Sequence, residues 1–250
     1  MAAPPSLSLC MLVKNEAQAL PRCLASLAAG DPDGLITERI VLDTGSTDDT
    51  IALARRLQCQ VFSYVWNDDF AAARNHSLAQ ASGDWILVLD ADEQLLPNAL
   101  LLLAPLLQQP DLVAINLLRQ EIGARQSPYS LVSRLFRRHP KLQFRRPYHA
   151  MIDDSLGELL QREPQWKVVD TTHPSLRHDG YQAGAIAAQN KFHRARTAME
   201  RYLAQRPDDG YCCAKLGALY GEQGDWARGI ALLERGLASL DLDGPDLDGP

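Results

Sequence analysis

Residues 85–93 read WILVLDADE, and this stretch decides the fold. Its first five residues are apolar without interruption, which is typical of a strand buried on both faces of a sheet. Three carboxylates then follow within four residues, at Asp90, Asp92 and Glu93. Like charges this close raise the cost of ionising one another. The end of this strand therefore requires a positive partner, unless the carboxylates turn out into water.

Strands of the same apolar kind precede this one. They are predicted at residues 7–13, 39–43 and 59–65, with a fourth at 85–90. Between them, apolar residues recur at helical spacing, at 16–29, 51–57 and 70–81. Apolar strands that alternate with helices are typical of a parallel sheet covered on both faces. The sequence thus predicts an α/β fold.

The pattern changes after this first half. Segments within 112–138 look like strands without intervening helices, which predicts an antiparallel extension of the sheet, and 166–172 is a further candidate strand. From Ala183 the pattern is helical. We therefore expect one large domain over residues 1–182, a small helical region over 183–240, and a tail at 241–250. The tail repeats a five-residue unit rich in Gly, Pro and Asp, and it is predicted to be disordered.

Composition limits the function. The 250-residue chain has a net charge of −6 and a pI of about 5.5, which argues against general binding of nucleic acid. An anionic ligand would then need a local source of positive charge, such as a metal ion or an arginine cluster. Five cysteines without a CxxC pair indicate reduced thiols in a cytoplasmic protein. No apolar run reaches the ~18 residues of a membrane span.

Polar residues gather where the predicted strands end. The first strand ends in VKNE, with Asn15 and Glu16, and the second ends in Asp43. In an open parallel sheet, ligands bind at the carboxyl ends of the strands. Asp43 comes before the residues that would cap the next helix, so capping does not explain it.

The pair formed by Asp90 and Asp92 points to a cation. Two apart on an extended backbone, their side chains face the same way and form a half-shell of hard oxygen ligands. Mg²⁺ or Mn²⁺ prefers one or two carboxylates, with substrate phosphates and water completing the octahedron. The alternative is a solvated loop after a strand.

Several motifs together resemble a known enzyme family. CMLVKNE, IVLDTGSTDDT, WNDDFAAARNHSLAQASGDWILVLDADE and LRHDGY resemble the inverting family 2 glycosyltransferases of GT-A fold, in particular the bacterial branch fused to tetratricopeptide repeats. The resemblance covers about residues 6–181. It implies metal-assisted transfer of a sugar from a nucleotide diphosphate donor to an acceptor. The expected donor is a UDP-sugar, and the acceptor is a glycan, a lipid-linked sugar or a protein. The expected location is the cytoplasm, including the inner face of the membrane.

The resemblance also implies roles for single residues. Val13 and Glu16, with Asn15 between them, match the loop that contacts the nucleotide base. Asp43 matches an aspartate that binds uracil or ribose. The remaining matches are Arg74 and Asn75 near the sugar-phosphate, Asp90 near the ribose, sugar and metal, and Asp92 on the metal.

One position departs from the family. Where the branch commonly has His-Glu, this chain has His149 followed by Ala150, so the general base that inversion requires stays open. Its candidates are His149, Asp153, Asp154, Glu158 and Asp179. His149 has alternative roles as a third metal ligand, as a contact to the diphosphate, or as a structural histidine. Ala150 also leaves open a transferase-like domain without turnover, which would act as a binding or scaffold protein.

Two further features have open interpretations. The segment 134–146 contains six cations and no carboxylate, which fits either a solvated strand face or a site for a diphosphate or anionic acceptor. Residues 211–237 resemble one tetratricopeptide repeat. A single repeat cannot bury its apolar face alone, so a protein partner or self-association is expected there. Nucleotidyltransferases and Rossmann dehydrogenases are disfavoured, because no glycine-rich loop follows any strand.

Overall fold

The computed structural model describes residues 5–124, 127–179 and 185–239. The chain divides into two compact units. The first comprises Met1–Arg145 and Ala150–Ala183, and the second comprises Arg146–His149 and Gly184–Pro250. The predicted boundary at 182–183 and the predicted disordered tail lie outside the described residues.

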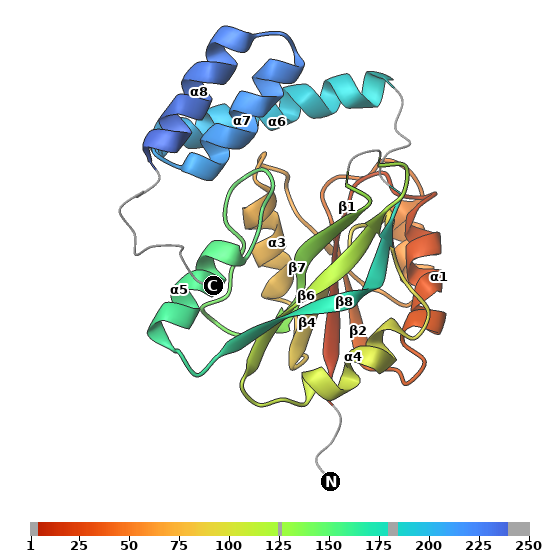
Figure 1. The fold of residues 1–250 in the computed structure, drawn as a ribbon. Coiled ribbons are helices and arrows are strands. Elements are labelled where there is room, and N and C mark those ends of the chain that lie inside the picture. The colour runs from red at the N-terminus through yellow and green to blue at the C-terminus, as the bar shows by residue number, and fades with distance from the viewer. Residues whose placement is uncertain (1–4, 125–126, 180–184, 240–250) are drawn as a thin grey trace. The chain divides into compact units, whose positions relative to one another are not determined.

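The first half of the sheet is parallel, as predicted. Its strands are β1 (Leu7–Val13), β2 (Ile36–Asp43), β3 (Gln60–Ser63) and β4 (Trp85–Val88). β1 lies between β2 and β4, and β3 pairs with β2, all in parallel (Figure 1). Their carboxyl ends therefore meet at one edge of the sheet, and the register places Val13 opposite Asp43.

The second half of the sheet contains the predicted antiparallel extension. β7 (Tyr129–Arg137) is antiparallel to β4 and to β6 (Leu112–Glu121). β8 (Lys167–His178) runs parallel to β6 and is longer than predicted. A three-residue strand, β5 (Glu93–Leu95), pairs with β8 directly after the carboxylate cluster. The sequence does not predict β5, because three residues are too few to show a period.

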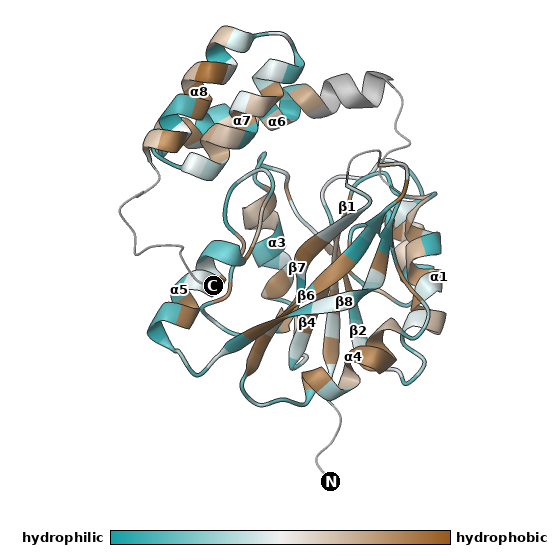
Figure 2. Cartoon of the chain, viewed as in Figure 1, coloured by the Kyte–Doolittle hydropathy of each residue, from teal (hydrophilic) through white to brown (hydrophobic). Residues whose placement is uncertain are grey.

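Helices cover both faces of the sheet. They are α1 (Leu20–Gly30), α2 (Thr50–Arg56), α3 (Phe70–Leu78), α4 (Ala99–Leu107) and α5 (Asp153–Arg162). α1 and α4 share one buried cluster with Trp85 and Leu87, whereas α3 and α5 share another with Ile86 and Val88. β4 is thus buried on both faces, which confirms the reading of its apolar run. Figure 2 shows hydrophobic residues along the strands of the sheet. The sequence analysis did not assign α4 or α5.

The second unit contains the helices α6 (Ala185–Gln205), α7 (Gly210–Glu222) and α8 (Trp226–Ala238). The predicted helical pattern after Ala183 is therefore confirmed for the described part. Glycines let α7 and α8 cross closely, since a Cβ on Gly217 would lie 2.9 Å from the Gly229 carbonyl oxygen. No helix in the described ranges is long and apolar enough to cross a membrane.

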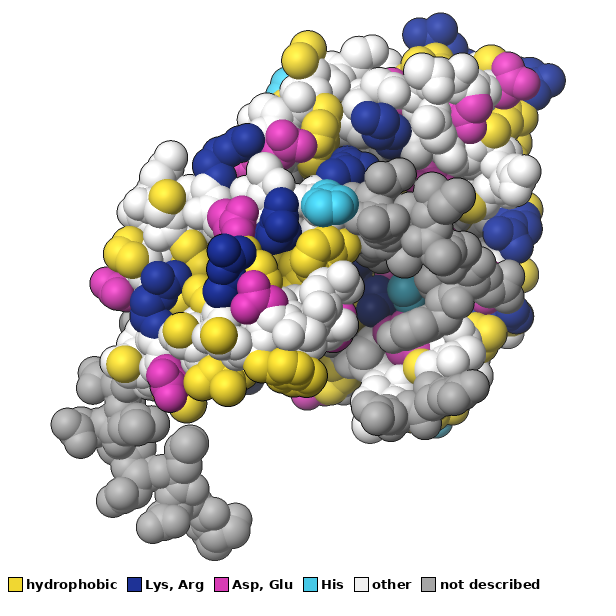
Figure 3. Space-filling view, turned by 90° about the horizontal axis from the view of Figure 1, so that it is seen from above, with side chains coloured by type: hydrophobic (Ala, Val, Ile, Leu, Met, Phe, Trp, Pro, Cys, Tyr) yellow, Lys and Arg dark blue, Asp and Glu magenta, His cyan; other side chains and the backbone are white. Residues whose placement is uncertain are grey.

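The basic segment 134–146 serves internal contacts. Each of its cations has a partner: Arg134 pairs with Asp90, Arg137 donates to the carbonyls of Leu112 and Gln109, Arg138 donates to that of Gly83, and Lys141, Arg145 and Arg146 pair with Glu163, Glu158 and Asp209. In Figure 3, Lys and Arg side chains lie among acidic and apolar ones rather than as one basic surface. This arrangement favours a structural role for the segment.

Candidate functional site

The loops that follow β1 and β2 are joined by hydrogen bonds. The backbone N–H of Asn15 donates to Ser46 Oγ at 2.9 Å, and Asn15 Oδ1 accepts from the N–H of Thr47 at 2.8 Å. The N–H of Glu16 donates to Thr50 Oγ1 at 2.7 Å. Asn15 adopts a left-handed backbone with φ 58°, which asparagine tolerates better than most residues. Asn15 thus helps to build one wall of the sheet edge.

Asp43 shapes the second of these loops. Its side chain is buried, and its carboxylate accepts hydrogen bonds from the N–H of Gly45 at 3.0 Å and of Ser46 at 3.1 Å. Val13, opposite Asp43 in the sheet, accepts from the N–H of Thr44 through its carbonyl. A contact between Asp43 and a nucleotide stays a prediction.

The chain turns sharply after β4. The N–H of Glu93 donates to the carbonyl of Asp90 at 3.0 Å, and the N–H of Asp90 donates to Glu93 Oε2 at 2.8 Å. Asp92 lies within this turn, so the expectation that Asp90 and Asp92 share an extended backbone is wrong. The two carboxylates have different partners as a consequence.

Two arginines hold the carboxylate of Asp90. Arg74 Nη2 donates to Oδ1 and Arg134 Nη2 donates to Oδ2, each at 2.7 Å. Burial by itself would raise the pKa of Asp90, but the two guanidinium groups hold that pKa far below its ordinary value. The positive charge that the sequence requires at this strand end therefore comes from arginine side chains. This differs from the expected half-shell, in which both aspartates face one cation.

The ARN motif in α3 places Arg74 at this site. Asn75 Oδ1 accepts from the N–H of Phe144 at 2.8 Å, and its Nδ2 donates to the Phe144 carbonyl at 2.9 Å. The guanidinium of Arg74 lies 5.3 Å from the centre of the Phe144 ring. Asn75 thus fixes the segment against which Arg74 packs.

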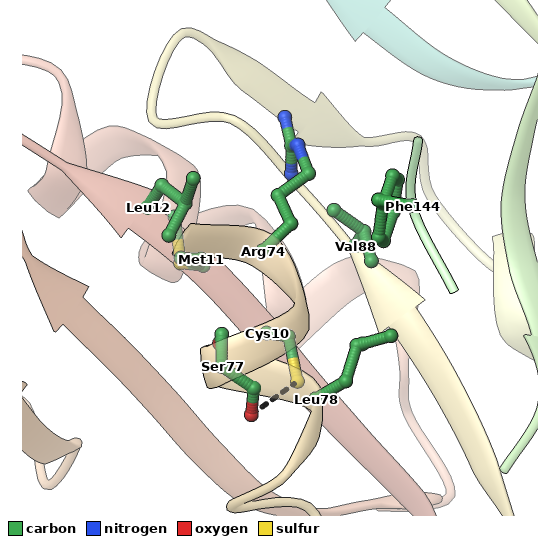
Figure 4. A pocket seen from close by; sticks show the side chains of 8 residues that line it. All are labelled: Cys10, Met11, Leu12, Arg74, Ser77, Leu78, Val88 and Phe144. Atoms are coloured by element: carbon green, nitrogen blue, oxygen red, sulfur yellow. Dashed lines mark hydrogen bonds between the residues drawn. The ribbon is translucent and has the colours of Figure 1, made fainter. Parts of the chain in front are cut away.

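An apolar pocket lies beneath Arg74. It is lined by Cys10, Met11, Leu12, Arg74, Ser77, Leu78, Val88 and Phe144, and it has no room for a water molecule. Figure 4 shows the guanidinium at the far end of the side chain from Cys10 and Ser77. This apolar floor supports the stem of the arginine side chain.

The ion pairs continue from Asp90 into the sheet. Glu93, whose side chain is fully buried, accepts from Arg119 Nη1 at 2.6 Å and lies 3.7 Å from Arg134 Nη2. Arg119 also contacts Glu121 at 2.7 Å. We call these residues, together with Arg74, Asp90, Asp92 and His178, the strand-end network. In it, positive and negative groups alternate.

His178, at the end of β8, closes the strand-end network. Its Nδ1 lies 2.7 Å from Glu121 Oε2, and its Nε2 lies 3.3 Å from Asp92 Oδ2. The hydrogen bond to Asp92 and, against the effect of burial, the one to Glu121 raise the pKa of His178 to about 9. The sequence analysis missed His178 as a site residue, although it lies in the quoted LRHDGY motif.

Glu16 faces the same group of charges. Burial, and then the negative charges of Asp92, Asp90 and Asp48, raise the pKa of Glu16 to about 7. A cation bound nearby would favour its charged form, because opposite charge lowers the pKa of a carboxyl.

The candidates for the general base lie in different settings. Asp179 accepts from Gln94 Nε2 and Arg177 Nε, at 3.1 and 3.0 Å. Asp153 is exposed in the first turn of α5 and accepts from Ser133 Oγ at 3.0 Å. His149 belongs to the second unit. The structure therefore does not gather the three predicted catalytic residues into one described cluster.

Asp92 and His178 are the pair best suited to a metal. Among the described residues, no group of three or more His, Cys, Asp or Glu side chains could hold a metal ion. Asp92 is 42% exposed and lies against an imidazole, whereas Asp90 is occupied by its arginines. One carboxylate and one imidazole that gives up its proton on binding suit a cation whose other ligands come from substrate and water.

Comparison with known sequences identifies relatives. Residues 8–169 match the sequence model of glycosyl transferase family 2. A TPR repeat-containing protein of Synechococcus elongatus is 45% identical over 236 residues, 94% of this chain and 57% of that protein. The succinoglycan biosynthesis protein ExoU of Rhizobium meliloti is 36% identical over 104 residues, 40% of this chain and 30% of that protein. The chain thus spans little more than half of the first relative and a smaller part of the second.

Two solved structures share the fold. Glucosyl-3-phosphoglycerate synthase of Mycobacterium tuberculosis, with Mn²⁺, UDP and phosphoglyceric acid, matches with a TM-score of 0.56 at 21% identity, over 76% of each chain. S. aureus TarS in complex with UDP matches with a TM-score of 0.58 at 14% identity, over 98% of this chain and 95% of that one. The α/β fold predicted from the sequence, of GT-A type, is confirmed.

The strand-end network should dominate stability. Arg119→Met leaves Glu93 and Glu121 without their shared cation in a buried setting, so we expect it to lower the free energy of unfolding by about 3–5 kcal/mol. Lys141→Met breaks an exposed pair with Glu163 and should cost under about 1 kcal/mol. Urea denaturation of both variants tests this, and equal losses would show that the network contributes no more than a surface pair.

Protonation of His178 should stabilise the metal-free protein. A folded-state pKa raised from 6.5 to about 9 gives stability that is complete below pH 6.5 and is lost as the pH rises through 9. The free energy of unfolding in EDTA should therefore fall over this interval in the wild type, and it should fall less in His178→Gln. His173→Gln, which changes an exposed imidazole, is the control. Parallel pH profiles for the wild type and His178→Gln would contradict the assignment.

Proposed function

The chain belongs to glycosyl transferase family 2, and from this premise we propose that it transfers a sugar from a nucleotide diphosphate donor to an acceptor, with inversion. The solved structures of similar fold that contain UDP support a UDP-linked donor. The acceptor is a glycan, a lipid-linked sugar or a protein. The residues proposed below for the donor and the metal belong to the first unit.

The observation that carries the proposal is the pairing of Asp92 with His178 at the carboxyl edge of the sheet. Asp92 Oδ2 and His178 Nε2 are 3.3 Å apart, and both side chains are partly exposed. The other two carboxylates of the adjoining turn, Asp90 and Glu93, are already paired with arginines. An edge of this kind is where α/β sheets bind their ligands. Beside this pair lies Glu16, whose pKa the carboxylates of Asp92 and Asp90 raise.

We propose that Asp92 and His178 hold Mn²⁺ or Mg²⁺ together with the diphosphate. Such a cation supplies neutralisation of the charge that develops on the departing diphosphate. The arginines serve a different purpose, because Arg74 and Arg134 fix Asp90 at a position from which its carboxylate can accept hydrogen bonds from ribose or sugar hydroxyls. The loops around Asn15 and Asp43 form the wall that would accommodate the base.

Inversion requires one group to take the proton of the acceptor hydroxyl. We propose this group among His149, Asp153 and Asp179. Asp153 is the exposed carboxylate of the three, whereas Asp179 is held by Arg177 and Gln94.

Metal and UDP together should stabilise the protein through Asp92. At a ligand concentration of 100 times Kd the gain is about 2.7 kcal/mol, or roughly 5–10 °C in Tm. Asp92→Asn keeps the shape and removes the charge, so it should abolish the metal-dependent gain and most turnover. Asp33→Asn, in an exposed loop, is the matched control. A thermal-shift series in which both variants retain the wild-type gain would contradict the metal site and favour a solvated loop.

A second candidate function is binding without turnover, through the helical unit. Trp226, Ile230, Leu233 and Leu237 recur at helical spacing on α8, and each is between 41% and 66% exposed. All of these except Leu237 also line an apolar groove, together with small residues, among them Gly217 and Gly221. An exposed apolar surface of this kind can pair with the same surface of a second copy across a twofold axis. We therefore propose that the helical unit associates with a second copy of this chain.

Ile230→Glu should then shift the chain from dimer to monomer, because a charge would be buried in the apolar contact. Sedimentation equilibrium over a range of concentrations measures this. Ala231→Glu, an exposed change on another side of α8, should leave the association unchanged. A wild type that is monomeric throughout would contradict this second proposal and leave the transferase proposal unaffected.

A further inference from the structure

Four residues of the second unit come from the middle of the transferase sequence. Arg146–His149 belong to the helical unit, although Arg145 and Ala150 belong to the first. The base of this loop is closed within the first unit, where the backbones of Arg145 and Met151 pair through hydrogen bonds of 2.9 and 3.3 Å. We call residues 146–149 the shared loop.

A buried ion pair attaches the shared loop to the helices. Arg146 Nε donates to both carboxylate oxygens of Asp209, at 3.1 and 3.0 Å. Their side chains are only 11% and 12% exposed. The guanidinium of Arg146 also lies 4.7 Å from the centre of the Tyr211 ring, and Tyr148 packs against the core of the helical unit. The attachment is thus both ionic and apolar.

Asp209 is also the residue that starts α7. Its Oδ1 accepts from the N–H of Cys212 at 2.8 Å as an N-cap, and its Oδ2 accepts from Tyr202 Oη at 3.0 Å. Although burial opposes it, these contacts and Arg146 lower the pKa of Asp209, so the carboxylate is charged at neutral pH. The position of Arg146 is therefore tied to the beginning of a helix, which is a fixed point of the unit.

The backbone of the shared loop needs such support. Arg146 has φ 72° and His149 has φ 53°, so a non-glycine residue is left-handed at each end of the loop. This conformation is unfavourable for L-residues, and it persists where surrounding contacts determine it. Pro147 further restricts the residue before it. Without its attachment the loop would relax toward other conformations.

We propose that the helical unit fixes the conformation of the shared loop, and that Asp209 is a positioning residue for the transfer reaction because it acts through Arg146 on His149. This inference rests on the proposed function, in which His149 takes part in transfer. It assigns the helical unit a role in turnover, in addition to any role in association.

The test uses the full chain with isosteric or near-isosteric changes. Asp209→Asn keeps an N-cap oxygen and loses the charge, and Arg146→Gln removes the guanidinium. Asp225→Asn and Arg228→Gln are the matched controls, because Asp225 caps α8 and pairs with Arg228 in the same way but at an exposed site. The readouts are amide hydrogen exchange of the shared loop, binding of UDP with Mn²⁺, and release of UDP from a panel of UDP-sugars.

In both loop variants we expect exchange at Tyr148 and His149 to become about tenfold faster. We expect kcat for UDP release to fall about tenfold or more, because small misplacements of reacting groups are costly. KM for the donor and UDP affinity should stay within about twofold, which a general loss of folding would not allow. The control variants should match the wild type in all three readouts.

Two outcomes would overturn the inference. Unchanged exchange would show that Asp209 does not hold the loop, and faster exchange with unchanged kcat would show that the loop conformation does not matter for transfer. Failure of the proposed function is distinguishable, since a wild type that binds no UDP and releases none contradicts that function. The exchange result would then still decide whether the helical unit fixes the loop.

Discussion

The carboxylate of Asp90 between two guanidinium groups is the interaction on which the rest of the structure depends. A strand buried on both faces delivers three carboxylates to one point, and water cannot solvate all of them there. Arg74 from α3 and Arg134 from β7 neutralise Asp90, and Arg119 from β6 neutralises Glu93. Removing one partner from such a buried set costs far more than removing both members of a surface pair. The packing of α3 and the register of the antiparallel strands are therefore coupled to the strand end.

This coupling also explains which groups are left for chemistry. Once the arginines pair with Asp90 and Glu93, Asp92 is left paired only with His178, beside Glu16, and it is the most exposed carboxylate of the strand-end network at 42%. The protonation of Glu16 and of His178 responds to added charge. Burial and nearby carboxylates raise the pKa of Glu16, and hydrogen bonds to its carboxylate partners raise that of His178. In the proposed function, the pair of Asp92 and His178 would bind the cation that neutralises the departing diphosphate, next to carboxylates that are already paired with arginines.

The second unit combines segments that are far apart in the sequence. The helical unit contains its own core and a close α7–α8 hairpin, yet it also includes residues 146–149 from the transferase sequence. One side chain, Asp209, both begins α7 and binds Arg146. Under the proposed role of Asp209, a mutation of this residue would alter the conformation of residues 146–149.

The sequence by itself determined the parallel strands and helices of the first half, because apolar runs and helical spacing report the local period of the backbone. It also identified the strand ends where polar residues gather. The tertiary structure alone decided which charges meet there. Arg74 and Arg134 are 16 and 44 residues from Asp90, and His178 reaches Asp92 only because β8 pairs with the short β5. Such partners are set by strand pairing between segments far apart in the sequence, and no local pattern records this pairing. No local pattern records either that residues 146–149 belong to the helical unit.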